Sequence, residues 1–201
     1  MTTASATTDL LMTVAPKAPS ATVSAFLAGD VLNKAMVEFG ITTPQRVAAF
    51  IAQIAHETGQ LQWLEEIWGP TTAQTRYEPP TALAKRLGNI EPGDGKRYKG
   101  RGPIQITGRA NYRKYGAKLG LPLEAQPELA AQPAHGARIA ACYWRDHGLN
   151  ELADANTLAA FQQITRKING GLNGFADRVE RWEMAKQFFG IETPGGAEEM
   201  V

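Results

Sequence analysis

The residue best suited to acid–base chemistry in this chain is Glu57, in the segment AQIAHETGQ. It ends a strongly apolar helical pattern, and the carboxyl end of a helix disfavours an ionised carboxylate. A partly buried Glu held in that position suits a general acid, whereas the plainer interpretation is a solvated Glu near a helix end. His56 is by default a core histidine or a partner of its neighbour. Because Gln60 stands where HExxH requires a second His, a zinc metalloprotease loses its main support.

Further carboxyl groups follow shortly along the chain. The segment LEEIWGPT contains Glu65 and Glu66, and the segment RYEPP contains Glu78. Two carboxyl groups about 6.5–9.5 Å apart hold a water between them and invert a glycosidic centre, while about 5 Å favours a covalent, retaining mechanism. The spacing in the sequence leaves both mechanisms open. For each of these residues the plainer interpretation is a solvated side chain in a loop.

Aromatic side chains are crowded into the same stretch. Sugar rings stack on aromatic faces, although at least half of such residues are expected to be core. The four aromatics are Trp63, Trp68, Tyr77 and Tyr98.

Two glycine-rich segments offer polar groups. In GRGPIQITG, the alternation places Gln105 and Thr107 on one face of a short strand, where they can line a cleft. No Lys-Ser/Thr pair follows these glycines, so phosphate binding is a weak alternative. The segment INGGLNGFADR combines Asn and Gly before a helix that carries Arg178, so that its amides can approach an extended ligand.

Helices are expected to position these residues. Thr43 followed by Pro44 predicts a helix start, and Gly59 predicts the end of the helix that carries Glu57. Short strands are expected around Gly100 and Gly102, which makes the fold class α+β and mostly helical. The predicted helices span residues 23–39, 44–58, 127–131, 134–147, 157–168 and 176–189.

Composition excludes several classes of protein. The 201 residues include 21 Lys and Arg and 20 Asp and Glu, so no general attraction to nucleic acid follows. The single cysteine, Cys142, lies in an apolar helical stripe and is expected to be buried and inert. No apolar run approaches the length of a membrane span, and no secretory signal is recognised. We expect one catalytic domain over residues 21–191, a loosely ordered segment at 1–20 and a tail at 192–201.

Four segments together resemble glycoside hydrolase family 19, specifically its bacterial and phage branch of peptidoglycan-degrading endolysins. They are FIAQIAHETG, EEIWGPT, GDGKRYKGRGPIQITGRANYRKYG and INGGLNGFADR, in an order that covers about residues 24–190. The resemblance implies a lysozyme-like, two-lobed fold with a small β-element and a central cleft. It also implies inverting hydrolysis of a β-1,4 bond between amino sugars, without a cofactor or metal.

The resemblance also assigns roles to residues. Glu57 matches the general acid, Glu66 the general base, and Thr107 the residue that holds the attacking water, with Glu78 as an alternative base under the plant pattern. The expectation is that a cation such as Arg101 or Arg109 keeps Glu66 ionised. Positions that contact substrate in the family match Gln105, Asn111, Asn169, Tyr98 and Arg178.

The chain lacks the cysteines of the plant enzymes, which favours the peptidoglycan glycan strand over chitin as substrate. A chitinase and a non-catalytic glycan-binding protein remain as alternatives. We expect a monomer that binds neither nucleic acid nor a membrane stably. It is expected to be made in the host cytoplasm without a signal peptide, and to reach the wall after holin-type or other release. Phage, prophage and effector origins stay open.

Overall fold

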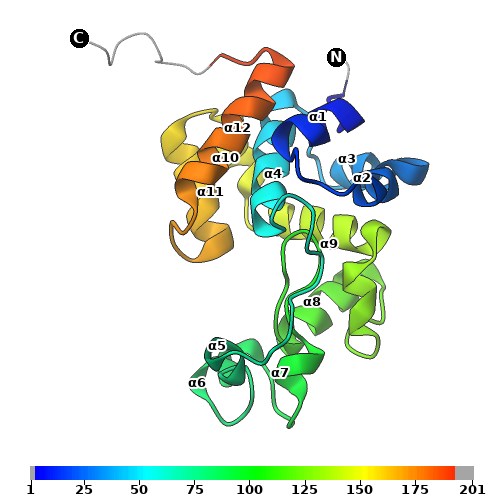
Figure 1. Cartoon of the computed structure of the whole chain (residues 1–201), viewed down its shortest axis with the longest axis vertical. Helices are drawn as coiled ribbons and strands as arrows, with labels where there is room; N and C mark the ends of the chain where they lie inside the picture. The colour runs from blue at the N-terminus through cyan, green and yellow to red at the C-terminus, as the bar shows by residue number, and fades with distance from the viewer. Residues whose placement is uncertain (1–2, 193–201) are drawn as a thin grey trace.

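The computed structural model describes residues 3–192, in which helices predominate (Figure 1). Of the expected tail at 192–201, only Glu192 lies within the described residues. The helical elements are α1 (Thr8–Val14), α2 (Ser20–Leu27), η1 (Ala28–Asp30), α3 (Val31–Glu38), α4 (Pro44–Glu57), α5 (Thr72–Thr75), α6 (Ala82–Leu87), α7 (Asp94–Arg97), α8 (Arg109–Leu119), η2 (Pro127–Ala131), α9 (Pro133–Asp146), α10 (Leu149–Asp154), α11 (Leu158–Asn169) and α12 (Phe175–Phe189). The mostly helical prediction is confirmed.

Helix α4 is the centre of the larger body. The Thr43 side chain accepts a hydrogen bond from the Arg46 amide, and Pro44 occupies the first turn, so the helix begins where the sequence predicts. Every residue from 47 to 55 is buried, which is typical of a helix covered on all sides. Figure 1 shows α4 between α1 and α12, and both helices contact it. Phe50 meets Trp144 of α9 edge to face at 5.3 Å.

A smaller body contains α5, α6 and α7, which lie at the end of the molecule opposite the N-terminus (Figure 1). Two segments, 58–71 and 98–108, connect it to the helices above. They are joined by hydrogen bonds from the Glu66 amide to the Gly100 carbonyl and from the Gly102 amide to the Leu64 carbonyl, each 2.8 Å. The smaller body is therefore joined to the rest of the molecule by two extended segments that are hydrogen-bonded to each other.

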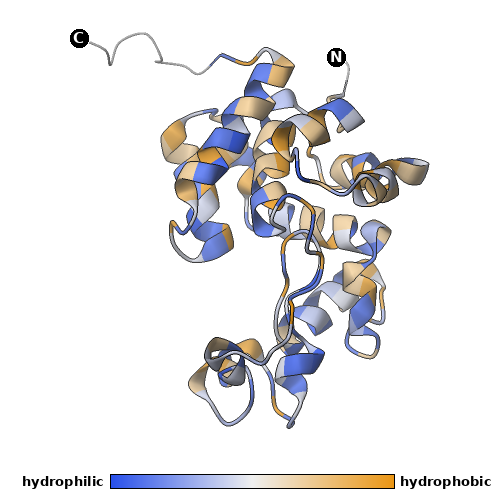
Figure 2. Ribbon diagram, in the orientation of Figure 1, coloured by the Kyte–Doolittle hydropathy of each residue, from blue (hydrophilic) through white to orange (hydrophobic). Residues whose placement is uncertain are grey.

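The predicted strands around Gly100 and Gly102 are wrong. Within residues 3–192 this region forms only isolated bridges, Glu65 to Arg101 and Arg101 to Ile106. The reason is backbone geometry, because Gly102 and Gln105 both have positive φ, which turns the chain instead of extending it. Residues 94–97 directly before them form the helix α7, which Figure 2 shows as hydrophilic.

Two other predictions need correction. The single helix predicted for residues 23–39 is interrupted, because Gly29 and Asp30 adopt left-handed conformations with φ of 59° and 63°. The segment 1–20 is not loose throughout. Residues 8–14 form α1, in which Leu10 and Val14 are fully buried against the larger body.

Apolar residues gather where the helices of the larger body face one another (Figure 2), and Cys142 is buried there as expected. None of the helices within residues 3–192 is both long and apolar enough to cross a bilayer.

The buried position of Leu10 makes α1 part of the cooperative core. Leu10→Ala is expected to lower the free energy of unfolding by about 2–4 kcal/mol, because the deletion leaves a cavity. Thr8→Ala, on the exposed side of the same helix, is the control and should change it by less than about 0.5 kcal/mol. Urea unfolding measures both, and equal, small effects would show that α1 contributes little to the core.

Candidate active site

Glu57, at the last turn of α4, is bound to a buried arginine of α12. One terminal nitrogen of Arg178, Nη2, donates to Glu57 Oε1 at 2.5 Å, and the other, Nη1, donates to Gln53 Oε1 at 2.5 Å. The side chain of Arg178 is 2% exposed and that of Glu57 is 18% exposed. Among the described residues no group donates to Glu57 Oε2, so one carboxyl oxygen is fixed and the other is free.

The glycine-rich segment explains how Arg178 reaches Glu57. Gly174 directly precedes α12 with φ of 69°, and a Cβ at that position would lie 2.2 Å from Cε1 of His56. Only glycine therefore lets α12 begin this close to the end of α4. The Asn173 carbonyl accepts from Arg178 Nε at 3.3 Å and holds the guanidinium at the start of the helix.

His56, which precedes Glu57 on α4, is in hydrogen-bonding contact with Asp177 of α12. Its Nδ1 lies 2.6 Å from Asp177 Oδ2, and Asp177 also accepts two hydrogen bonds from Arg181. Burial acts to raise the pKa of Asp177, but the hydrogen bonds from Arg181 and His56 hold it below its ordinary value. His56 therefore joins α4 to α12 as the partner of a carboxylate.

Glu66, unlike Glu57, accepts a hydrogen bond on each of its two carboxyl oxygens. The Gly100 amide donates to Glu66 Oε2 at 2.9 Å, and the side-chain amide of Gln74 donates to Oε1 at 2.9 Å. Both donors are neutral and each oxygen accepts one of them. These two contacts fix the orientation of the Glu66 carboxyl group.

The polar groups predicted from GRGPIQITG converge on the same point. A Cβ built on Gly100 would lie 2.8 Å from Gln105 Oε1 and 3.4 Å from both Glu66 Oε2 and Thr107 Oγ1. These three side chains thus surround one glycine, although no strand places them there. Gln105 is held by hydrogen bonds from its Nε2 to the carbonyls of Gly102 and Trp63, at 2.9 and 3.3 Å.

Gln74 is a residue that the sequence analysis missed. It is 5% exposed, and its Oε1 accepts from the Thr71 amide at 2.8 Å as part of a capping box that begins α5. Its Nε2 also donates to the Ile67 carbonyl at 2.7 Å. The spacing Thr-x-x-Gln is a known sequence signal for a helix start, and it could have located this side chain just after Glu66.

Asn111 and Asn169 each donate to a backbone carbonyl, in different parts of the molecule. Asn111 donates to the carbonyl of Thr107 at 2.8 Å, so it lies next to one of the residues around Gly100. Asn169 ends α11 and donates to the Asn173 carbonyl at 3.5 Å, so it lies beside the contact of Arg178 with that same carbonyl. The predicted residues thus form two groups, one around Glu57 and one around Glu66.

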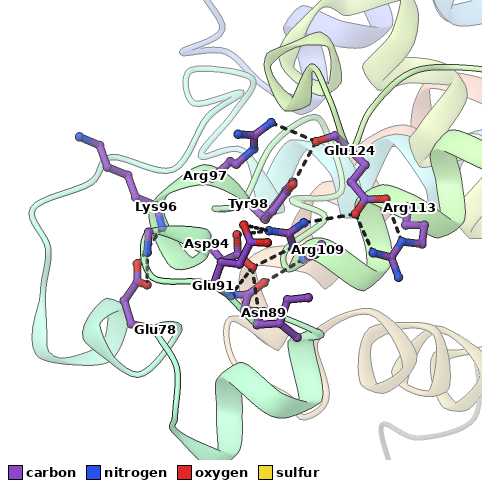
Figure 3. Close-up of polar contacts among 12 residues, drawn as sticks. Glu78, Asn89, Glu91, Asp94, Lys96, Arg97, Tyr98, Arg109, Arg113 and Glu124 are labelled. Carbon is purple, nitrogen blue, oxygen red and sulfur yellow. Dashed lines mark hydrogen bonds and ion pairs between the residues drawn. The ribbon is translucent and has the colours of Figure 1, made fainter.

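Three expectations are corrected by burial and pairing. Tyr98 is 1% exposed and donates to the Glu124 carbonyl, so it offers no surface to a ligand (Figure 3). Arg178 is also buried and contacts Glu57, which makes it a positioning residue. The cations expected near Glu66 are bound elsewhere, because Arg101 pairs with Glu65 at 2.9 Å and Arg109 with Asp94 at 2.6 Å.

Arg109, the first residue of α8, belongs to the charged network beside α7 that Figure 3 shows. Burial acts to raise the pKa of Asp94, but hydrogen bonds from Arg109 and from the amides of Ile90 and Glu91 hold it below its usual value. Glu78 lies in the same region, where its carboxylate accepts from the amides of Gly93 and Lys96 at 2.8 and 3.3 Å. Glu78 therefore caps α7, and the structure joins it to neither group of predicted site residues.

The aromatic residues divide as follows. Trp63 is 55% exposed on the segment between Glu57 and Glu66, and Trp68 packs against Tyr77 with ring centroids 6.2 Å apart. Trp68 and Tyr77 are half-buried and Tyr98 is buried, so Trp63 is the most exposed of the four aromatic side chains. In the part of the chain that is described, no three His, Cys, Asp or Glu side chains are grouped so that they could hold a metal ion.

Known proteins share this arrangement of elements. A family model described as "Chitinase class I" matches residues 21–151. A Haemophilus influenzae protein described as "Glycosyl hydrolase family 19 domain-containing protein" is 32% identical over 164 residues, which cover 70% of this chain and 78% of that protein. The Arabidopsis thaliana protein "Endochitinase At2g43610" is 36% identical over 133 residues, but the match spans only 42% of its length.

Among solved structures, chitinase C from Streptomyces griseus superposes with a TM-score of 0.71 at 25% identity, over 93% of this chain and 77% of that one. The agreement over nearly the whole chain confirms the fold that the resemblance implies.

Removing the buried guanidinium is expected to destabilise the chain. Arg178→Met should lower the free energy of unfolding by about 3–5 kcal/mol, because Gln53 and Glu57 lose their partner in a buried setting. Arg138→Met, which breaks the exposed pair with Glu38, is the matched control and should change it by about 1 kcal/mol or less. Equal losses in denaturant melts of the two variants would contradict a structural role for Arg178.

Proposed function

The chain belongs to glycoside hydrolase family 19 and is a glycosidase, and from that premise we propose that it hydrolyses β-1,4 bonds of the peptidoglycan glycan strand. The observation that carries the proposal is the contrast between its two carboxyl groups. Glu57 has one oxygen bound and one free, whereas both oxygens of Glu66 accept hydrogen bonds. Hydrolysis with inversion requires one protonated and one ionised carboxyl group.

Glu57 is the general acid in this proposal. Its free oxygen, Oε2, carries the proton and donates it to the departing glycosidic oxygen, while Arg178 holds Oε1 and fixes the direction of the carboxyl group.

Glu66 is the general base. Its oxygens accept hydrogen bonds from the Gly100 amide and the Gln74 side-chain amide, and the remaining lone pairs can take a proton from water. The hydroxyl of Thr107 lies on the same side of Gly100 and orients that water towards the sugar carbon. Gln105, Asn111 and Asn169 offer amides to the hydroxyl and acetyl groups of the glycan, and Trp63 offers a stacking face.

The peptidoglycan strand is preferred as substrate because the four motifs resemble the endolysin branch and because the chain has one cysteine. The setting of the reaction is then the bacterial cell wall, reached after release from the cytoplasm. Chitin is the second candidate, since several relatives and structural neighbours are named as chitinases. The match spans less than half of the Arabidopsis relative, so the activity of that whole protein is no direct guide.

Mass spectrometry of digested peptidoglycan tests the proposal, with colloidal chitin in parallel. Wild type is expected to release disaccharide-peptide fragments with new reducing ends. Glu57→Gln, assayed at a temperature where circular dichroism shows that the variant is folded, should lose roughly two to four orders of magnitude in rate. Cleaved stem peptides on intact glycan, or a variant that keeps more than about a tenth of the rate, would reject the mechanism. Products from chitin alone would favour the chitinase.

The contact between Gln74 and Glu66 predicts a change in pH dependence. Gln74→Glu preserves the capping acceptor at the start of α5 but faces Glu66 with a second carboxylate. Two carboxylates at one site resist double ionisation, so the acid limb of the kcat/KM profile should move to higher pH by about one unit. The exposed substitution Gln187→Glu is the control and should leave the limb in place. A profile identical to wild type would remove Gln74 from the site.

A further inference from the structure

A basic pocket lies beside α7, next to the segment that carries Glu65 and Glu66. Its volume is about 510 Å³, and its charged lining consists of Lys96, Arg97, Lys99, Arg101 and Glu65. Four cations thus face one carboxylate, whereas the chain as a whole has a formal charge of only +1. The pocket is therefore a local concentration of positive charge on a nearly neutral protein.

The cations of this pocket are unequally compensated. Glu65 Oε1 accepts from Lys99 Nζ at 3.2 Å and from Arg101 Nε at 2.9 Å, so these two share the single negative charge. Arg97 donates only to backbone carbonyls, those of Ala125 at 3.1 Å and Glu124 at 3.4 Å, which leave its charge in place. The ammonium of Lys96 has no partner among residues 3–192, and Figure 3 shows it extending away from the charged network.

This arrangement suits a carboxylate ligand. Arginine and lysine donors bind carboxylates through charge-assisted hydrogen bonds, and Lys96 and Arg97 have nitrogens free to make them. Polymers of N-acetylglucosamine are neutral. Peptidoglycan, in contrast, carries free carboxylates on its stem peptides, and a lactyl carboxylate wherever a sugar has no stem attached. A pocket built from cations therefore distinguishes the two candidate substrates by charge.

The position of the pocket relative to the reacting bond fits a stem peptide. Glu65 points to Arg101 and the next residue, Glu66, points to Gly100 and Gln74, so the two side chains lie on opposite faces of one extended segment. An extended stem of four residues spans about 13–14 Å, which is enough to pass around a single chain segment. The glycan can thus lie at Glu66 while its peptide reaches Lys96.

We propose that the pocket formed by Lys96, Arg97, Lys99, Arg101 and Glu65 is an anion subsite that binds peptidoglycan carboxylates and holds the strand during hydrolysis. The inference rests on the proposed substrate and extends it, because it names the part of the polymer that is recognised outside the reacting sugars.

Kinetics on three substrates test the subsite. They are intact peptidoglycan, the same glycan stripped of stem peptides by an amidase, and a neutral chitooligosaccharide. Lys96→Glu, with unchanged melting temperature, should raise KM for intact peptidoglycan about three- to tenfold at low salt without changing kcat, and leave the chitooligosaccharide unaffected. Lys85→Glu, the same charge change on the exposed face of α6, is the control and should not alter KM.

The stripped glycan identifies the source of the carboxylate. Removal of the stem frees a lactyl carboxylate, so loss of the Lys96→Glu effect on the stripped glycan assigns the subsite to the stem peptide. Persistence of the effect shows that the subsite binds the freed lactyl carboxylate as well. Either result supports the subsite. An effect equal to that of Lys85→Glu, or an equal effect on the neutral oligosaccharide, would overturn it.

A binding measurement separates the subsite from the activity. The isotope-labelled chain is titrated with a free stem tetrapeptide and followed by NMR. Shifts centred on Lys96 and Arg97 that disappear in Lys96→Glu support the subsite even if wild type fails to cleave peptidoglycan, in which case only the proposed substrate is lost. The absence of such shifts at millimolar peptide would reject the stem-peptide assignment, and together with control-like kinetics it would reject the subsite.

Discussion

The buried guanidinium of Arg178 is the interaction on which the rest of the arrangement depends. A charge removed from water must be paired, and Arg178 is paired through Glu57 and hydrogen-bonded to Gln53, both on α4. Gln53 in turn donates to Thr165 of α11 at 2.9 Å, so one polar chain fixes three helices. Because α12 must approach α4 this closely, its first turn needs Gly174. The pairing of Arg178 therefore both holds α12 against α4 and fixes the orientation of the Glu57 carboxyl group.

Much of the larger body could be predicted because the residues that start and stabilise its helices lie within those helices or next to them in the sequence. Thr43 and Pro44 begin α4 through their own side chains, and apolar periodicity marks α9, α11 and α12. The break at Gly29, the short helix α1 and the short helices of the smaller body could not be predicted in the same way. Short helices gain most of their stability from packing against distant residues, as Leu10 does, and no local pattern contains that information.

The candidate site, like the fold, could be predicted only where local sequence patterns decide the outcome. Residue types and spacing singled out Glu57 and Thr107, whereas the family resemblance selected Glu66 among three candidate carboxyl groups. The structure places Thr107 near Glu66 for a reason that alternation missed, namely a turn around Gly100. Burial is decided by tertiary contacts, so the sequence could not separate an exposed aromatic such as Trp63 from the enclosed Tyr98. The two carboxyl groups are held from different bodies of the chain.

The anomeric configuration of the first product tests the central claim most directly, because it reports whether water or a carboxylate attacks the sugar. Proton NMR, recorded in the first minutes of hydrolysis of a soluble β-1,4-linked glycan fragment, distinguishes the two anomers before they interconvert. If Glu57 donates the proton and Glu66 activates a water, the new reducing end appears first as the α-anomer. Initial release of the β-anomer would contradict the account, since retention requires a first displacement by a carboxylate or by the sugar's own N-acetyl group before water attacks.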